Sequence, residues 1–96
     1  MENIVYLSFF KAAPDATFTL ARDHWATEQH IINSGIASTF LRDNFYTDFF
    51  SHMVGEDGVL RGPAADGRVA SVTRADVARV AATVLQNPAA HIGQTY

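Results

Sequence analysis

The run IVYLSFF at residues 4 to 10 constrains the fold more than any other stretch of this sequence. Its first six residues combine β-branched and aromatic side chains, and no polar residue interrupts them before Ser8. An apolar run of this kind is typical of a strand that is covered on both faces, as in a parallel sheet. We therefore expect Ile4–Phe9 to be a central strand. Such a strand needs neighbours, because a bare edge invites pairing with another chain.

The segment that follows has helical periodicity. A helix is expected from about Phe18 to Ser34, and Gly35 stands at the C′ position where helices commonly end. One face of this helix carries Phe18, Ala21, Trp25, Glu28 and Ile32. A second strand is expected from Ile36 to Leu41, ending at Arg42.

The second half of the chain carries weaker signals. Asn44 to Met53 is aromatic-rich and is predicted to be helical in part. Short extended pieces are expected at Val59–Leu60 and at Val69–Val72, between turn-rich stretches.

A last helix is expected to begin after Thr73. The Thr73 hydroxyl suits an N-cap, and Asp76 suits the positive end of the helix. The helix is predicted to bury Val77, Val80, Ala81 and Val84, and to end near Asn87-Pro88. The final GQTY resembles the start of a further strand.

Strands that alternate with helices predict an α/β sheet with right-handed crossovers. A length of 96 residues allows one domain, and 48% hydrophobic with 18% charged residues is a globular balance. The net charge of -3 and scattered basic residues argue against a nucleic-acid surface. No apolar run is long enough to span a bilayer, and no cysteine is present to form disulfides. Because the N-terminus lacks the basic stretch of a signal peptide, a cytoplasmic location is expected.

The runs SGIASTFLRDNFY and VASVTRADVA are the most specific parts of a likeness that covers nearly the whole chain. The sequence resembles the NmrA-like branch of the atypical short-chain dehydrogenases, which includes NAD(P)H:quinone oxidoreductases. This resemblance implies a Rossmann-type domain with a parallel sheet in a three-layer αβα arrangement. It also implies NADP or NAD as the cofactor.

The resemblance further implies that residues 1 to 96 are only the C-terminal part of such a domain. The family's Gly-rich phosphate loop lies in its first βα unit, and no G-x-G-x-x-G or G-x-x-G-x-x-G follows a strand here. We therefore expect a truncated or split protein that binds dinucleotide poorly by itself. Its expected partners are a second copy, as a dimer, or a chain that supplies the missing N-terminal half.

Three residues are candidates for catalysis by resemblance. Ser8 stands where ordinary short-chain dehydrogenases place a serine, at the carboxyl end of a parallel strand. The family's Y-x-x-x-K positions are best matched by His24 and Glu28, whose spacing puts both on one helix face. His24 would exchange a proton near neutral pH, oriented by Glu28. The structural alternative is a His–Glu pair in a pocket wall without chemistry. The only lysine, Lys11, is expected in a loop and cannot replace the family's lysine.

The resemblance also places the segment after the second strand against the nicotinamide and the substrate. The predicted cofactor contacts are Ser8, Phe9, Arg42, Asp43, Asn44 and Phe45, and the predicted substrate contacts are Phe10, Trp25, Tyr46 and Phe49. Planar aromatic side chains suit a quinone because they stack on it. For Phe45 and Phe49 a place in the core is equally compatible with the pattern. Arg42 is expected to pair with an acidic neighbour.

A metal site is not expected. The pattern H-x-x-x-E-x-H at residues 24 to 30 matches no zinc motif, and His30 lies on a different helix face from His24. The resemblance implies an NAD(P)H-dependent oxidoreductase of quinone-reductase type that passes hydride to a quinone-like acceptor. The alternative is a non-catalytic NmrA-like redox-sensing or protein-binding module, because the departures from the family pattern fit both.

Overall fold

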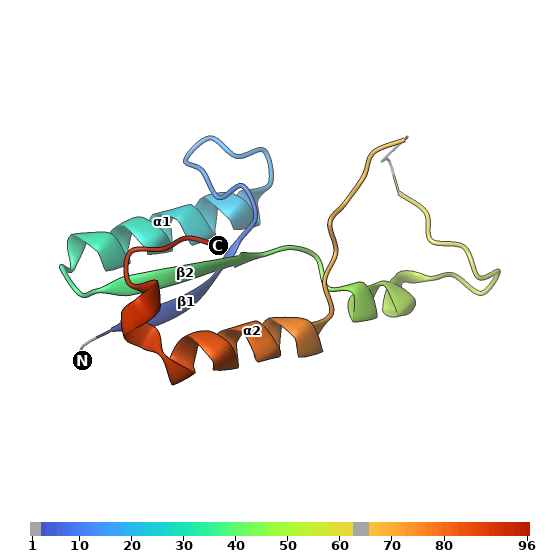
Figure 1. The fold of residues 1–96 in the computed structure, drawn as a ribbon. Helices are drawn as coiled ribbons and strands as arrows, with labels where there is room; N and C mark the ends of the chain where they lie inside the picture. Colours follow the sequence, from blue (N-terminus) through green and yellow to red (C-terminus); the bar gives the residue numbers. More distant parts are fainter. Residues whose placement is uncertain (1–2, 63–65) are drawn as a thin grey trace.

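The computed structural model describes residues 3 to 62 and 66 to 96 (Figure 1). Two strands, β1 (Ile4–Phe9) and β2 (Ser38–Asp43), form a parallel pair in which Ser8 lies opposite Arg42. The helical elements are α1 (Thr19–Asn33), the 3-10 helix η1 (Thr47–Met53), α2 (Arg74–Gln86) and the 3-10 helix η2 (Pro88–His91).

The β1–α1–β2 crossover follows the predicted pattern. β1 has the predicted bounds, and α1 differs from its predicted bounds by one residue at each end. Gly35 has φ +77°, so it adopts the left-handed conformation expected after the helix. α1 and α2 lie on opposite faces of the strand pair, which gives the expected three layers (Figure 1). The result is a small α/β fold with parallel strands, consistent with part of a Rossmann-like domain.

The C-terminal segment adds a short extended neighbour to β2, as the GQTY pattern predicts. The Phe40 N–H donates to the Gln94 carbonyl at 3.0 Å, and the Tyr96 N–H donates to the Phe40 carbonyl at 2.9 Å. Thr95 forms a parallel bridge with Phe40. β2 is therefore hydrogen-bonded along both edges. Within the residues that the structure describes, β1 is hydrogen-bonded to a strand along one edge only, so the central position expected for Ile4–Phe9 is not found there.

Some residues on the apolar helix faces indicated by periodicity are exposed. Val84 is buried on α2, but Val80 is 51% exposed, and Ile32 on α1 is 50% exposed. Neighbouring strands lie only about 4.8 Å apart, so two strands and a short C-terminal segment make a narrow platform. Helix residues that do not lie directly over this platform remain in contact with water.

The predicted strand at Val59–Leu60 is wrong. The Gly55 N–H donates to the Val59 carbonyl at 3.0 Å, and Gly58 has φ +75°, so this stretch closes a turn. In the predicted extended piece at Val69–Val72, only Val72 forms a bridge, to Tyr46. Turn-forming glycines outweigh the weak apolar pattern in this part of the chain.

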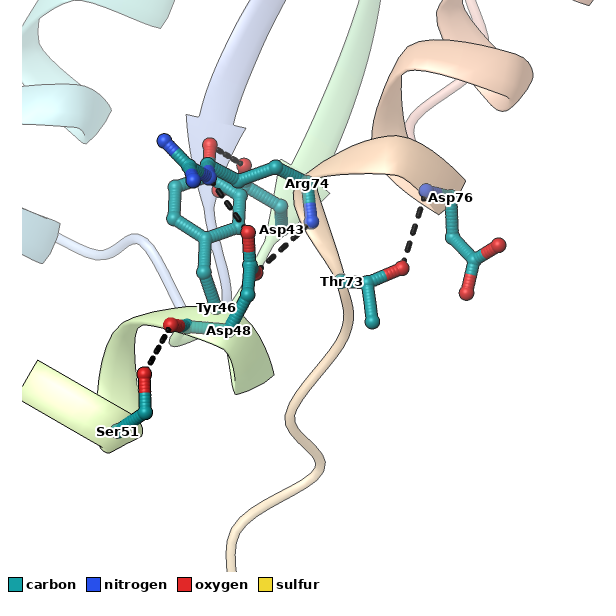
Figure 2. A network of polar contacts seen from close by, with 7 residues as sticks. All are labelled: Asp43, Tyr46, Asp48, Ser51, Thr73, Arg74 and Asp76. Atoms are coloured by element: carbon teal, nitrogen blue, oxygen red, sulfur yellow. Dashed lines mark hydrogen bonds and ion pairs between the residues drawn. The ribbon is translucent and has the colours of Figure 1, made fainter.

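A polar network joins η1 to the start of α2 (Figure 2). Thr73 accepts from the Asp76 backbone N–H at 3.2 Å, which confirms the predicted cap. The Asp48 carboxylate accepts from the backbone N–H of Arg74 at 3.2 Å and from its Nε at 2.6 Å. The Tyr46 hydroxyl donates to the Asp43 carboxylate at 2.7 Å. These bonds restrain the segment that leaves the carboxyl end of β2.

Candidate functional site

An open cavity of about 540 Å³ lies at the carboxyl ends of the two strands. β1 contributes Phe9 at its end, and the residues that follow β2 contribute Asn44 and Phe45. In open α/β sheets, ligands bind outside the carboxyl ends of parallel strands. The cavity therefore occupies the position where this architecture places a ligand.

Aromatic rings form the wall of this cavity. The ring centroids of Phe9 and Phe18 lie 5.4 Å apart, and the Phe45 centroid lies 5.7 Å from each of them. Phe18 and Phe45 are each 45% exposed, although they line a concave surface. Large aromatic side chains left open in a concavity are typical of a ligand-binding site, and planar ligands suit them best.

A tight turn carries the chain from β1 into the cavity rim. The Phe10 N–H donates to the Asp43 carbonyl at 2.7 Å, and the Ala12 N–H donates to the Phe9 carbonyl at 3.1 Å. Between them, Lys11 adopts φ +56°. The Lys11 ammonium lies 5.4 Å from the centroid of the Phe10 ring, within range of a cation–π contact. The turn thus brings a cation beside the aromatic wall.

A buried polar cluster ties α1 to both strands next to the cavity. Arg42 donates to the two Glu28 carboxylate oxygens, from Nε at 3.0 Å and from Nη2 at 2.7 Å. The Ser8 hydroxyl donates to the same carboxylate. Ser8 and Glu28 are each only 1% exposed. The predicted acidic partner of Arg42 therefore comes from α1 and not from the neighbouring Asp43.

The electrostatics of the cluster favour its charged state. Burial raises the pKa of Glu28, but the hydrogen bonds from Arg42 and Ser8 outweigh burial and hold that pKa below its ordinary value. The hydrogen bond to Glu28 also raises the pKa of Arg42. A carboxylate held ionised and saturated with donors is suited to fixing neighbouring groups in place.

The expected contact between Glu28 and His24 is not found, since each side chain has another partner. His24 Nδ1 lies 2.6 Å from the Tyr6 hydroxyl, and its ring stacks on Phe9 with centroids 6.3 Å apart. Residues 6 and 8 point to the same face of β1, beneath α1. Each of the two helix residues therefore meets the strand residue opposite it, and the i, i+4 neighbours do not bond to one another.

The structure brings together some of the predicted ligand contacts and separates others. Phe9, Phe10, Asn44 and Phe45 line the 540 Å³ cavity. Arg42 and Asp43 instead line a smaller one of about 190 Å³ beside α2.

Three predicted substrate contacts, Trp25, Tyr46 and Phe49, do not line the large cavity. The hydrogen bond to Asp43, with burial, raises the pKa of the Tyr46 phenol, whose proton is thus held locally. Phe49 contacts His52 with ring centroids 5.9 Å apart. Trp25 is half-buried on α1.

The cavity also includes residues that the sequence does not identify as ligand contacts. Among them are Phe18, which the periodicity places only on a helix face, and the two cations Lys11 and Arg68. Phe18 follows a loop that begins at the end of β1, which is the one sequence signal that places it near the strand ends.

The described residues provide neither a metal site nor a membrane-spanning helix. No group of three or more His, Cys, Asp or Glu side chains in residues 3 to 62 and 66 to 96 is arranged to hold a metal ion. None of the helices in the same residues has the length and apolar character needed to cross a membrane.

Comparisons with known proteins point to one group of enzymes. No family profile matches the sequence. The chain is 38% identical over 96 residues to quinone oxidoreductase 2 of Escherichia coli K12, covering 97% of this chain and 33% of that protein. It is 30% identical over 99 residues to the NAD(P)H azoreductase of Xenophilus azovorans, covering 100% of this chain and 34% of that protein. The chain thus spans about a third of the length of the curated relatives it matches.

Solved structures give the same result. The crystal structure of the E. coli NADPH-dependent quinone oxidoreductase complexed with NADPH matches with a TM-score of 0.83 and 37% identity, covering 99% of this chain and 34% of that one. A second crystal structure of that enzyme matches with a TM-score of 0.82, covering 99% and 35%. This chain is therefore homologous in sequence and fold to one segment of quinone oxidoreductase 2, and homologous in sequence to one segment of NAD(P)H azoreductase.

Proposed function

We propose that this chain is a segment of an NAD(P)H-dependent oxidoreductase of the quinone-reductase type, and that the aromatic cavity is where the nicotinamide and the acceptor meet. The observation that carries the proposal is the cavity at the carboxyl ends of β1 and β2. The chain that forms this cavity is 37% identical to the matching segment of a quinone oxidoreductase whose structure was solved with NADPH. Membership of the NmrA-like branch agrees with this proposal but rests on resemblance alone.

The described residues of the cavity fit the nicotinamide end of a dinucleotide. Phe9, Phe10, Asn44 and Phe45 offer flat apolar faces and an amide, which suit a nicotinamide or a planar acceptor. The bound dinucleotide supplies the hydride, and the protein supplies orientation and exclusion of water. The loop from β1 to α1, residues 10 to 18, contains no glycine, so it lacks the Gly-rich turn that brings backbone N–H groups to a pyrophosphate. We infer that this chain alone binds dinucleotide weakly.

The groups beside the cavity act as positioning residues in this proposal. Glu28 joins Ser8 near the end of β1 to Arg42 near the end of β2, which fixes the two strand ends relative to each other. His24, held by Tyr6, supports the ring of Phe9. A displacement of about 1 Å at a reacting centre costs about a hundredfold in rate, so such supports matter to an oxidoreductase.

The proposal is tested first with the 96-residue chain and a chimera. The chimera carries this chain in place of the matching segment of E. coli quinone oxidoreductase 2. NADPH should not saturate the chain alone at micromolar concentrations, whereas the chimera should bind NADPH and oxidise it in the presence of a quinone. A folded chimera that binds NADPH but reduces no quinone contradicts the proposed function. Micromolar binding by the chain alone contradicts the inference that its phosphate site is absent.

Phe45→Ala in the chimera should raise the KM for the quinone about five- to tenfold, because one ring of the wall is lost. Phe49→Ala is the matched control, since Phe49 is an exposed phenylalanine four residues further on that does not line the cavity. Steady-state kinetics with menadione measure both variants. Equal KM values for the two variants would show that the quinone does not bind in the cavity.

A further inference from the structure

We propose that the aromatic cavity selects planar aromatic ligands that carry an anionic substituent. This inference rests on the proposed function and names the chemical class of its acceptor. Two observations support it, the ring-lined wall described above and an excess of positive charge at the cavity edge.

The charged side chains that line the cavity are Lys11, Asp15 and Arg68, which gives two cations and one carboxylate. The whole chain, in contrast, has a net charge of -3. The cavity edge is therefore locally positive on an acidic protein. Cations beside an apolar surface attract an anion and orient the apolar part of a ligand toward the wall.

The side chains of Lys11 and Arg68 are available to bind a ligand. The ion pairs found among residues 3 to 62 and 66 to 96 engage four arginines, Arg42, Arg61, Arg74 and Arg79. Lys11 and Arg68 are in none of these pairs, and both are exposed. An unpaired cation keeps its hydrogen-bond donors available for an anionic group.

The backbone at Lys11 adds independent support. A lysine at φ +56° occupies the left-handed region, which is unfavourable for a residue with a long side chain. Two hydrogen bonds hold the turn on either side of it, from Phe10 to Asp43 and from Ala12 to Phe9, and Ala12 is buried. A conformation that costs free energy and is held from both sides is typical of a functional position.

Ligand titrations of the 96-residue chain, followed by NMR, test the inference without cofactor or turnover. The probes are naphthalenesulfonate, the neutral naphthalenesulfonamide of the same size, and methanesulfonate, which has the anion without the rings. Naphthalenesulfonate should bind about five- to tenfold more tightly than the sulfonamide, as expected for two exposed charge contacts. Methanesulfonate should bind more weakly than either ring compound.

Single substitutions assign the effect to the named residues. Lys11→Asn removes the charge but keeps a residue that tolerates the left-handed conformation. Lys11→Asn and Arg68→Gln should each weaken naphthalenesulfonate binding about two- to fivefold and leave sulfonamide binding unchanged. Asp15→Asn should strengthen naphthalenesulfonate binding. Arg79→Gln is the control for loss of one positive charge, because Arg79 pairs with Asp76 on α2, away from the cavity.

The outcomes separate this inference from the proposed function. Equal binding of the two naphthalene probes, or no effect of the Lys11 and Arg68 substitutions, overturns the selectivity and leaves the ring site intact. Methanesulfonate binding as tight as that of naphthalenesulfonate also overturns it, because the site would then be a simple anion site that suits a cofactor phosphate. Failure of the neutral sulfonamide to shift any cavity resonance counts against the acceptor site itself.

Discussion

Replacing Arg42 with methionine is expected to lower the free energy of unfolding by about 3 to 5 kcal/mol, because the substitution leaves Glu28 buried without its counter-ion. Methionine keeps much of the apolar volume of the arginine stem, so the loss reports mainly on the charge and its hydrogen bonds. A small domain has only about 5 to 15 kcal/mol of stability in total. Urea unfolding followed by circular dichroism measures the change.

The matched control is Arg74→Met. Arg74 also pairs with a carboxylate, Asp48, but its side chain is largely exposed, so water replaces the lost contact and little change is expected. The double variant Glu28→Met with Arg42→Met should recover part of the stability lost in Arg42→Met, because no unpaired buried charge remains. Equal destabilisation by Arg42→Met and Arg74→Met would show that the buried cluster does not hold α1 to the strands.

Glu28→Gln should change how stability depends on pH. The folded-state pKa of Glu28 lies below its ordinary value of 4.5, so the carboxylate contributes its full stabilisation above about pH 4.5. That contribution is lost as the pH falls through the lowered folded-state pKa. At neutral pH the variant should be less stable than the wild-type chain by about 3 kcal/mol, because Arg42 loses its charged partner.

The stability difference between the wild-type chain and Glu28→Gln should then shrink as the pH falls below 4.5. Urea midpoints measured from pH 7 down to pH 3 give the difference directly. Asp48→Asn is the control, since the pKa of Asp48 is also lowered, by its hydrogen bond to Arg74, but its ion pair is on the surface. A difference that stays constant over the whole range would mean that Glu28 has the same pKa in the folded and unfolded states.

The local elements were predictable because their causes are local. The apolar run at residues 4 to 9, the periodicity that leads to Gly35, and the Thr73 cap each depend on residues a few positions apart. The exposure of Val80 was not predictable in this way, because burial depends on how wide the sheet beneath α2 is.

In the buried polar cluster of the candidate site, the individual residues could be predicted from the sequence, but the contacts between them could not. Ser8, Glu28 and Arg42 were each identified from the chain, but their mutual contacts were not. The spacing of His24 and Glu28 suggested a pair on one helix face. In the fold, the two strands offer each of them a closer partner, Tyr6 for His24 and the Ser8–Arg42 pair for Glu28.

By itself the sequence determined the two strands and the two long helices, that the strands run parallel, and that aromatic residues follow the strand ends, but not the turn at residues 55 to 59. Only the tertiary structure decided the strand register and the placement of the helices. The register pairs Ser8 with Arg42 across the sheet, and the placement of α1 sets Glu28 between them. The tertiary structure also brought Lys11 and Arg68, 57 positions apart in the chain, to the lining of one aromatic cavity. Local propensity acts over a few residues, whereas contacts of this kind depend on the whole chain closing on itself.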